Sequence, residues 1–351
     1  MSTIQVGFVG VGMMSQVAHI PAFQRASGAE LTAIASSRPV LLGQVADRFG
    51  IARRYASHEE LGRDPEVDLV MVVVPPELNP DICISLLEAG KHVICEKPVS
   101  LSSAAAQRMA DAQKASGKQL LVGFMKRHDA GVQAAKAVVD RWLASGEAGA
   151  LLYARAHAFI GGDWTGNIEG LMPVLTSDEP SSDKPADVIA DCVPAQHAGM
   201  WGECYFHNHV HSHDMDLLAH FLGRDCSVSY ADWSTATKLV VFDFGGVPAT
   251  LETAKAGSNA RWDEELKVYF EGGWVHVKLP PPLLINAPAQ VEVYWMGERQ
   301  EVCDVHAPYS WSFLRQAQNA VDVVAGTAEP ICTIEDGVVQ VRMTEATFGR
   351  V

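Results

Sequence analysis

A glycine-rich turn directly after the first apolar strand constrains the fold of this chain more than any other feature. Residues 4–9 read as a buried strand and residues 14–26 as a helix, and the turn between them carries glycines at positions 10 and 12. Gly10 permits the tight turn, Gly12 lets the backbone approach a pyrophosphate, and Ser15 is small enough for close packing of helix on strand. The first helical amides can then donate to phosphate. This pattern predicts a dinucleotide-binding turn.

Strands and helices alternate over the first 125 residues. Further strands are expected at 30–35, 68–74, 91–95 and 119–123, with helices at 40–49, 80–89 and 102–116. The strand at 68–74 is almost entirely aliphatic, as expected when both faces of a parallel sheet are covered. The alternation predicts an α/β fold whose N-terminal domain, residues 1–125, is a doubly wound Rossmann parallel sheet that binds NAD(P).

The pattern changes after residue 125 and predicts a second, α+β domain over residues 126–351. A helix at 129–145 and a strand at 150–158 precede a long irregular stretch at 160–205, which we interpret as an ordered insertion near the active site. A helix is expected at 213–222, and the chain closes with a helix at 310–325 and a short C-terminal segment. Strands predicted between them form a mostly antiparallel sheet: 237–244, 247–254, 265–270, 274–279 and 290–295.

Composition excludes several classes of partner. The 351 residues carry a net charge of −15 and contain no run of five basic residues, so nucleic acid and anionic membranes are poor partners. The seven cysteines are odd in number and form no C-x-x-C pair, which favours reduced thiols. The N-terminus has no signal-peptide pattern, and the apolar runs are too short to span a bilayer. We therefore expect a cytoplasmic protein.

A charged pair and a proline, Glu96-Lys97-Pro98, end the apolar strand that contains Cys95. Ligands of open α/β sheets bind beyond the carboxyl ends of the strands. Lys97 is therefore expected beside a bound cofactor, where a lysine indicates chemistry as well as binding.

The end of the second strand bears on the choice of cofactor. An NAD site usually places an acidic residue there, against the ribose hydroxyls. This chain has Ser37 and Arg38 instead, and a hydroxyl with a guanidinium suits a 2′-phosphate. We favour NADP over NAD, with the alternative that Arg38 only stacks on adenine or faces water.

Three sequence features together carry a family resemblance. They are the glycine turn, the segment from Leu86 to Pro98 (Leu-Leu-Glu-Ala-Gly-Lys-His-Val-Ile-Cys-Glu-Lys-Pro) and a later His-x-x-Asp. The chain resembles the glucose–fructose oxidoreductase / inositol dehydrogenase (Gfo/Idh/MocA) family over nearly its whole length. The resemblance implies a second domain with a large open sheet used for oligomerisation, hence a homodimer or homotetramer. Family members mostly oxidise or reduce sugars, cyclitols and their derivatives with NAD(P).

The resemblance also implies a catalytic histidine. In family members this residue lies three positions before an Asp and ten before a Gly, a spacing that His213, Asp216 and Gly223 match. Four residues earlier, where the family often has Asp, this chain has His209. We expect the following cofactor-binding residues: Gly10, Gly12, Met13, Met14, Ser37, Arg38, Pro75, Asn79, Glu96 and Lys97.

The chemistry of hydride transfer explains these residue types. A proton must leave oxygen as a hydride leaves carbon, and the imidazole of His213 can accept that proton near neutral pH. Lys97 can stabilise negative charge on the same oxygen, and Asp216 or His209 is expected to tune the relay. The expected substrate-contacting residues are Arg127, Trp164, Asn208, His209 and His213.

Four histidines alternate from His207 to His213, which in an extended segment would also resemble a metal site. A helix beginning near His213 would break the alternation, and four ligands so close in sequence seldom converge on one ion. We therefore predict no metal, with two of these histidines lining the pocket and two structural.

These observations predict an NAD(P)-dependent sugar or cyclitol oxidoreductase that transfers a hydride between the nicotinamide and a secondary hydroxyl or keto group of a sugar, glycoside or cyclitol. One alternative is a glycosidase that uses a tightly held NAD for transient oxidation, elimination and re-reduction. Another is a non-catalytic regulator that senses the cofactor, although the presence of both Lys97 and His213 argues against it.

Overall fold

The structure, a computed structural model, describes residues 3–161, 173–179, 201–256, 262–297 and 300–349. The chain divides into two compact units. Unit 1 comprises Met1–Phe124, Gly170–Ala198 and Phe313–Val341, and unit 2 comprises Met125–Glu169, Gly199–Ser312 and Arg342–Val351. The chain runs through unit 1 to Phe124, enters unit 2 and later returns to unit 1. Each unit is described by itself.

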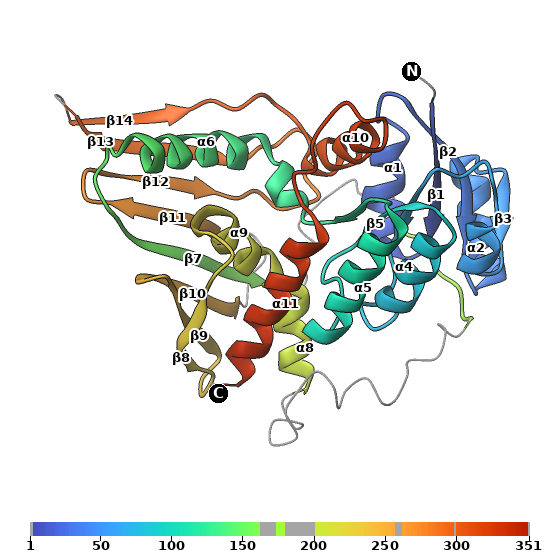
Figure 1. Cartoon of the computed structure of the whole chain (residues 1–351), viewed down its shortest axis with the longest axis horizontal. Coiled ribbons are helices and arrows are strands. Elements are labelled where there is room, and N and C mark those ends of the chain that lie inside the picture. The colour runs from blue at the N-terminus through green and yellow to red at the C-terminus, as the bar shows by residue number, and fades with distance from the viewer. Residues whose placement is uncertain (1–2, 162–172, 180–200, 257–261, 298–299, 350–351) are drawn as a thin grey trace. The chain divides into compact units, whose positions relative to one another are not determined.

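Unit 1 contains a six-stranded parallel sheet with strand order β3-β2-β1-β4-β5-β6, the order of doubly wound dinucleotide-binding domains (Figure 1). Its strands are β1 (Ile4–Val9), β2 (Ala29–Ala35), β3 (Arg53–Tyr55), β4 (Leu69–Val72), β5 (His92–Cys95) and β6 (Leu120–Val122). Every residue of β4 is buried, because the strand is central and covered on both faces. The predicted Rossmann sheet is confirmed.

Helices alternate with these strands. They are the π-helical turn η1 (Ser15–His19), α1 (Ile20–Phe23), α2 (Pro39–Phe49), α3 (His58–Gly62), α4 (Asn79–Glu88) and α5 (Ser103–Ser116). The core beneath α4 and α5 joins Leu86, Met109 and Phe124 to Val93 of β5. Ser102 caps α5 by accepting a hydrogen bond from the Ala105 amide at 3.2 Å. The Ser102 cap thus fixes where α5 begins, and its apolar residues fix which face packs on the core.

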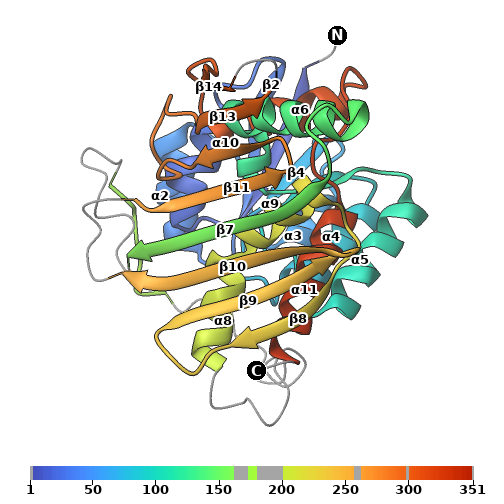
Figure 2. The ribbon, with the colours of Figure 1, turned by 90° about the vertical axis from the view of Figure 1, so that its left-hand side faces the viewer.

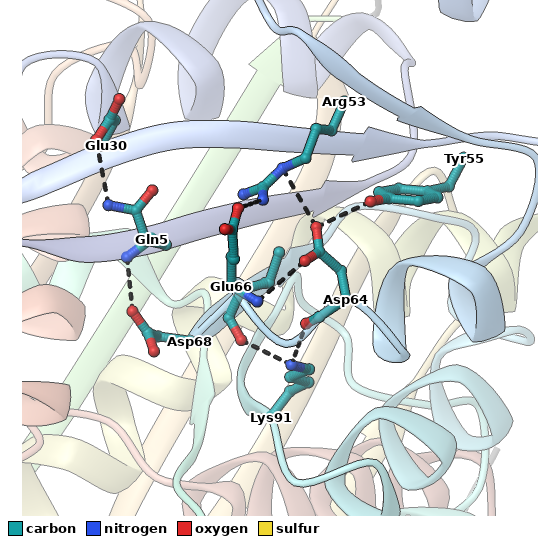
Figure 3. Close-up of polar contacts among 9 residues, drawn as sticks. Gln5, Glu30, Arg53, Tyr55, Asp64, Glu66, Asp68 and Lys91 are labelled. Carbon is teal, nitrogen blue, oxygen red and sulfur yellow. Dashed lines mark hydrogen bonds and ion pairs between the residues drawn. The ribbon is translucent and has the colours of Figure 1, made fainter.

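A polar network ties down the amino ends of the unit 1 strands (Figure 3). Asp64 accepts hydrogen bonds from Tyr55 (2.9 Å) and pairs with Arg53 (3.2 Å). The buried ammonium of Lys91 donates to the carbonyls of Asp64 (2.5 Å) and Val67 (2.8 Å). Burial lowers the pKa of Lys91, although nearby Asp64 favours the charged form. These contacts fix the edge of the sheet at the amino ends of its strands.

Unit 2 contains an eight-stranded, mostly antiparallel sheet with order β14-β13-β12-β11-β7-β10-β9-β8, and Figure 2 shows the strands side by side. The strands are β7 (Leu151–Gly161), β8 (Ser227–Asp232), β9 (Thr237–Phe244), β10 (Val247–Ala256), β11 (Glu264–Phe270), β12 (Gly273–Lys278), β13 (Gln290–Met296) and β14 (Gln300–Val305). Only the β7–β10 pair is parallel among the described ladders. The predicted second sheet is confirmed.

Among the described residues, the helices that lie wholly in unit 2 are α6 (Ala130–Ser145), α8 (Trp201–Val210) and α9 (Ser212–Leu222), and the 3₁₀ turn η2 (Met125–His128) precedes α6. Trp142 of α6 packs edge-on against Phe270 of β11, with ring centroids 5.3 Å apart. Asp129 caps α6 and also accepts the Ala289 amide at 2.9 Å. No helix among the described residues is both long and apolar enough to span a membrane.

The main difference from the predicted elements lies at the C-terminus. The predicted short segment is a helix, α11 (Ile334–Phe348), which follows α10 (Ser312–Val324). Asp336 accepts hydrogen bonds from both the amide (2.9 Å) and the hydroxyl (3.3 Å) of Thr333 at the start of α11. The Thr-x-x-Asp spacing is a helix-start signal in the sequence. Strands β3, β8 and β14, each at an edge of its sheet, were also not predicted.

Candidate functional site

The glycine turn of unit 1 has the geometry that a dinucleotide requires. Gly10 has φ +106°, and a Cβ there would lie 2.1 Å from the carbonyl oxygen of Val73, so no other residue fits. A Cβ on Gly12 would meet no heavy atom within 4 Å, which leaves open space above the turn. The Ser15 hydroxyl donates to the Gly10 carbonyl at 2.9 Å and closes the turn from below. These residues fit an approaching pyrophosphate.

The end of β2 lies beside this turn, because the Gly10 amide donates to the Ala35 carbonyl at 3.0 Å. Ser37 is exposed and Arg38 is half-buried, and the Arg38 amide donates to the hydroxyl of Ser36 at 3.2 Å. Three other expected cofactor residues of unit 1 are at least partly exposed: Met13, Met14 and Pro75.

At the end of β5, Glu96 forms a buried pair with His19, with 2.7 Å between Oε1 and the His19 Nε2. The second carboxylate oxygen accepts the amide of Lys97 at 2.8 Å. Burial alone would raise the pKa of Glu96, but the hydrogen bond and charge of His19, together with Lys97, hold that pKa below its usual value. The carboxylate is therefore ionised near neutral pH, and it connects the helix after the glycine turn to the backbone of Lys97.

Asn79, at the start of α4, holds the same backbone from the other side. Its buried side-chain amide donates to the carbonyls of Glu96 (3.3 Å) and Pro98 (3.1 Å). The Lys97–Pro98 peptide bond is cis. Lys97 itself is half-buried. The residues around Lys97 therefore fix its main chain at the carboxyl end of β5, and the residue as a whole is partly exposed there.

In unit 2, His213 is the second residue of α9 and is 8% exposed. His209 is half-buried on α8, where its ring stacks on Tyr205 with centroids 5.3 Å apart. Asn208 is buried, and its side-chain oxygen accepts the hydroxyl of Thr344 at 3.3 Å. Two short helices, and not an extended segment, therefore carry the histidine-rich sequence.

Arg127 and Asp216 form a bidentate buried ion pair in unit 2. The Arg127 Nε lies 3.0 and 2.9 Å from the two carboxylate oxygens, and the Nη2 lies 2.7 Å from the first. Both side chains are at most 5% exposed. The pair fixes the 3₁₀ turn η2 against α9. Arg127 was predicted to contact the substrate and Asp216 to tune the proton relay, and in the structure these two side chains bind each other.

A second buried cluster lies beside the first and was not predicted. Lys126 contacts Glu264, which also accepts the indole N–H of Trp262 at 2.9 Å and shares a hydrogen bond with Asp214. Burial raises the pKa of Glu264 to about 7, with Lys126 acting against the shift and Asp214 adding to it. Burial likewise raises the pKa of Asp214. The cluster thus contains two carboxyl groups and one ammonium, and one of its members, Asp214, directly follows His213 in the sequence.

The remaining histidines of the segment are buried. His207 packs edge-on against Trp233, with centroids 4.7 Å apart, and burial together with the charge of His211 holds its pKa well below the usual value. His211 lies 3.3 Å from a carboxylate oxygen of Asp214. Within the described part of the chain, no three His, Cys, Asp or Glu side chains converge as metal ligands would. Trp164 lies outside the described residues.

The N-terminal sequence matches a family model described as "Oxidoreductase family, NAD-binding Rossmann fold" (GFO_IDH_MocA) over residues 4–124. Residues 4–124 are therefore similar to the NAD-binding region of the Gfo/Idh/MocA oxidoreductases. Inositol 2-dehydrogenase of Salmonella typhimurium is 31% identical over 149 residues, which cover 42% of this chain and 43% of that protein. Inositol 2-dehydrogenase 3 of Saccharopolyspora erythraea is 36% identical over 140 residues, 39% of this chain and 41% of that protein. The matched stretch thus spans less than half of these curated relatives.

Solved structures extend the likeness of fold to the whole chain. An aldose-aldose oxidoreductase from Caulobacter crescentus, complexed with glycerol, superposes with a TM-score of 0.76 at 19% identity, covering 99% of this chain and 97% of its own. A 3-ketoreductase from Actinomadura kijaniata, in complex with NADP, gives a TM-score of 0.72 at 20% identity, covering 99% and 98%. At these identities the likeness concerns the fold alone.

Several residues at the candidate site escaped the sequence analysis. His19 has no signal of its own, because only the fold brings it to Glu96. Glu264 begins β11, 138 positions from the Lys126 it contacts. Lys126 stands next to Arg127 in the sequence, but only the fold buries it and brings it to Glu264.

Proposed function

We propose that this protein is an NAD(P)-dependent oxidoreductase that acts on a secondary hydroxyl or keto group of a sugar, glycoside or cyclitol. Hydride transfer to or from carbon is the chemistry that a bound nicotinamide supplies. The observation that carries the proposal is the position of Lys97. It directly follows a parallel strand of the region that matches an NAD-binding family model, and Glu96 and Asn79 fix its backbone while the residue is only half-buried.

Lys97 would polarise the reacting oxygen. An ammonium held at the ligand-binding edge can donate a hydrogen bond to a carbonyl or an alkoxide, and this contact strengthens as negative charge develops on oxygen. The ionised Glu96 supports this function, because its carboxylate accepts the amide of Lys97 and so anchors the main chain of that residue.

His213 would move the proton between the substrate oxygen and the protein. His213 lies near the start of α9, the helix that also carries the buried Asp214 and Asp216, and Asp216 is paired with Arg127 of η2. The Arg127–Asp216 pair supports a positioning role, since a bidentate pair fixes the turn of helix that carries His213. His209, half-buried on the preceding helix α8, remains our candidate to tune the proton relay. Asn208 and Arg127 remain our candidates for contacts with the substrate.

The preference between NAD and NADP depends on the end of β2. With Ser37 and Arg38 alone we favour NADP, because a guanidinium recognises a 2′-phosphate. A carboxylate from another part of unit 1 acts in the opposite direction at the same place, as described below. A homodimer or homotetramer built through the open sheet remains part of the proposal.

The test is a Lys97→Met variant assayed beside wild type. Formation of reduced nicotinamide is followed with a panel of sugars, cyclitols and glycosides, using NAD and NADP separately. We expect turnover to fall by at least about a thousandfold, as for removal of an electrostatic stabiliser, while the dissociation constant for the cofactor changes by less than about fivefold. Lys114→Met, on the exposed side of α5, is the matched control and should retain full activity.

Full turnover by Lys97→Met would refute the assigned role of Lys97. Release of an aglycone from glycosides without net reduction of the cofactor would instead favour the redox-assisted glycosidase. Tight cofactor binding with no turnover on any substrate would favour the non-catalytic regulator. The three outcomes separate the classes of function that the sequence left open.

A further inference from the structure

The segment 173–179 of unit 1 lies against the dinucleotide-binding turn. The buried side chain of Gln16, one residue after Ser15, bonds to both main-chain groups of Leu175. Its amide donates to the Leu175 carbonyl at 3.0 Å, and its oxygen accepts the Leu175 amide at 2.9 Å. The same amide also donates to the carbonyl of Val11 at 2.9 Å. One side chain thus joins the segment to the glycine turn.

The segment also reaches the start of α2, where it appears beside that helix as the short yellow-green stretch between grey traces (Figure 1). The two carboxylate oxygens of Glu179 accept the amides of Val40 and Leu41, each at 3.0 Å. Ser177 donates to the same carboxylate at 2.9 Å. Because Pro39 begins α2 and has no N–H, these two amides are the first donors that the helix presents.

Hydrogen bonds, with a smaller contribution from charge, keep this carboxylate ionised. The hydrogen bond from the Val40 amide is the largest influence on the pKa of Glu179, and the Leu41 amide, Ser177 and the charge of Arg38 also lower that pKa. The positive end of the α2 dipole acts in the same sense. Glu179 therefore holds a negative charge beside Arg38 at the carboxyl end of β2.

This position is the one that decides between the two nicotinamide dinucleotides. In a dinucleotide-binding domain, the end of the second strand receives the ribose of adenosine, where an acidic side chain accepts the hydroxyls of NAD and an arginine accepts the 2′-phosphate of NADP. Here β2 supplies Arg38 but no acid. The acidic side chain is instead Glu179, about 140 positions later in the chain. Its carboxylate already accepts the two α2 amides that could otherwise donate to a phosphate.

We propose that Glu179 occupies the 2′-phosphate position and thereby makes the protein select NAD over NADP. This inference rests on the proposed function, since it assumes that unit 1 binds a dinucleotide. A phosphate brought to this corner would meet a like charge and lose the two amide donors. The ribose hydroxyls of NAD can instead donate to a carboxylate. Arg38 balances the charge of Glu179 and does not by itself define an NADP site.

The test measures dissociation constants of NAD and NADP for the full chain by quenching of tryptophan fluorescence, without substrate. Wild type should bind NAD more tightly than NADP. In Glu179→Gln, which keeps the shape but removes the charge, binding of NADP should tighten about tenfold while that of NAD changes less than about threefold. Glu179→Ala provides a second charge-removing variant. Asp178→Asn, an exposed carboxylate next to it, is the matched control and should leave both constants unchanged.

A further variant identifies the group that accepts the phosphate. Adding Arg38→Met to Glu179→Gln should abolish the gain in NADP binding and leave NAD binding within about threefold. If both Glu179 variants keep the wild-type ratio of the two dissociation constants, the inference is wrong while the proposed function stands. If wild type binds neither dinucleotide, the proposed function fails and the inference fails with it.

Discussion

Two buried glutamates, one in each unit, differ in the charge they carry. Glu96 of unit 1 accepts hydrogen bonds from His19 and from the amide of Lys97, and its pKa lies below the usual value. Glu264 of unit 2 contacts Lys126 but shares its surroundings with a second carboxyl group, Asp214, and its pKa rises to about 7. Burial opposes ionisation in both. The number of acids that compete for one cation decides the outcome.

The two glutamates therefore respond to pH in opposite ways. Because the folded pKa of Glu96 is lowered, this residue contributes stability above its unfolded pKa, and the contribution is lost as pH falls through the folded value. For Glu264 the folded pKa is raised from 4.5 to about 7, so the folded state binds the proton more tightly. Stability from this group is full below the unfolded pKa and falls as pH rises towards 7.

The largest effect should come from removing the single cation of the unit 2 cluster. In Lys126→Met the two carboxyl groups lose the only ammonium that contacts Glu264 among the described residues, and we expect a loss of roughly 3–5 kcal/mol in the free energy of unfolding at pH 7. Urea unfolding measures it. Lys136→Met, which breaks only the surface pair with Asp140, is the control and should cost less than about 1 kcal/mol. Equal losses in the two variants would contradict the account of the cluster.

An intermediate effect is expected from neutralising Glu264. Glu264→Gln removes the group that must keep its proton in the folded state, so unfolding free energy should fall less between about pH 4.5 and pH 7 than in wild type. The difference in slope, integrated over that range, should reach up to about 3 kcal/mol. The measurement is urea unfolding at a series of pH values. Parallel pH profiles for the two proteins would show that Glu264 titrates normally.

The smallest effect should come from His19→Gln in unit 1. The glutamine amide can still donate to Glu96, but the charge-assisted contact is lost, and we expect a cost of about 1 kcal/mol at neutral pH. Because the pKa of Glu96 then moves back towards its usual value, acid unfolding should begin at higher pH than in wild type. A variant that unfolds in acid at the wild-type pH would remove His19 from the explanation of the Glu96 pKa.

The contrast between the units also explains what the sequence could predict. Local sequence patterns were enough to predict the glycine turn, the end of β5 and the alternation of strands and helices in the parallel sheet. These features depend on residues that are close in the sequence and on aliphatic runs. The contacts of Lys126 with Glu264 and of Glu179 with α2 depend on chain segments that only the folded topology brings together. The spacing that identified His213 and Asp216 was visible, but the bidentate partner of Asp216 was not.

The parallel pair in the sheet of unit 2 has a consequence for biosynthesis. β7 is paired on one side with β10 and on the other with β11, and both partners follow it in the chain, the first only from Val247. At typical synthesis rates of 5–20 residues per second, the ribosome needs on the order of ten seconds to reach that partner. During this time the backbone N–H and C=O groups on both edges of β7 lack their native hydrogen-bond partners. This central strand of the finished sheet is therefore exposed to incorrect pairing throughout that interval.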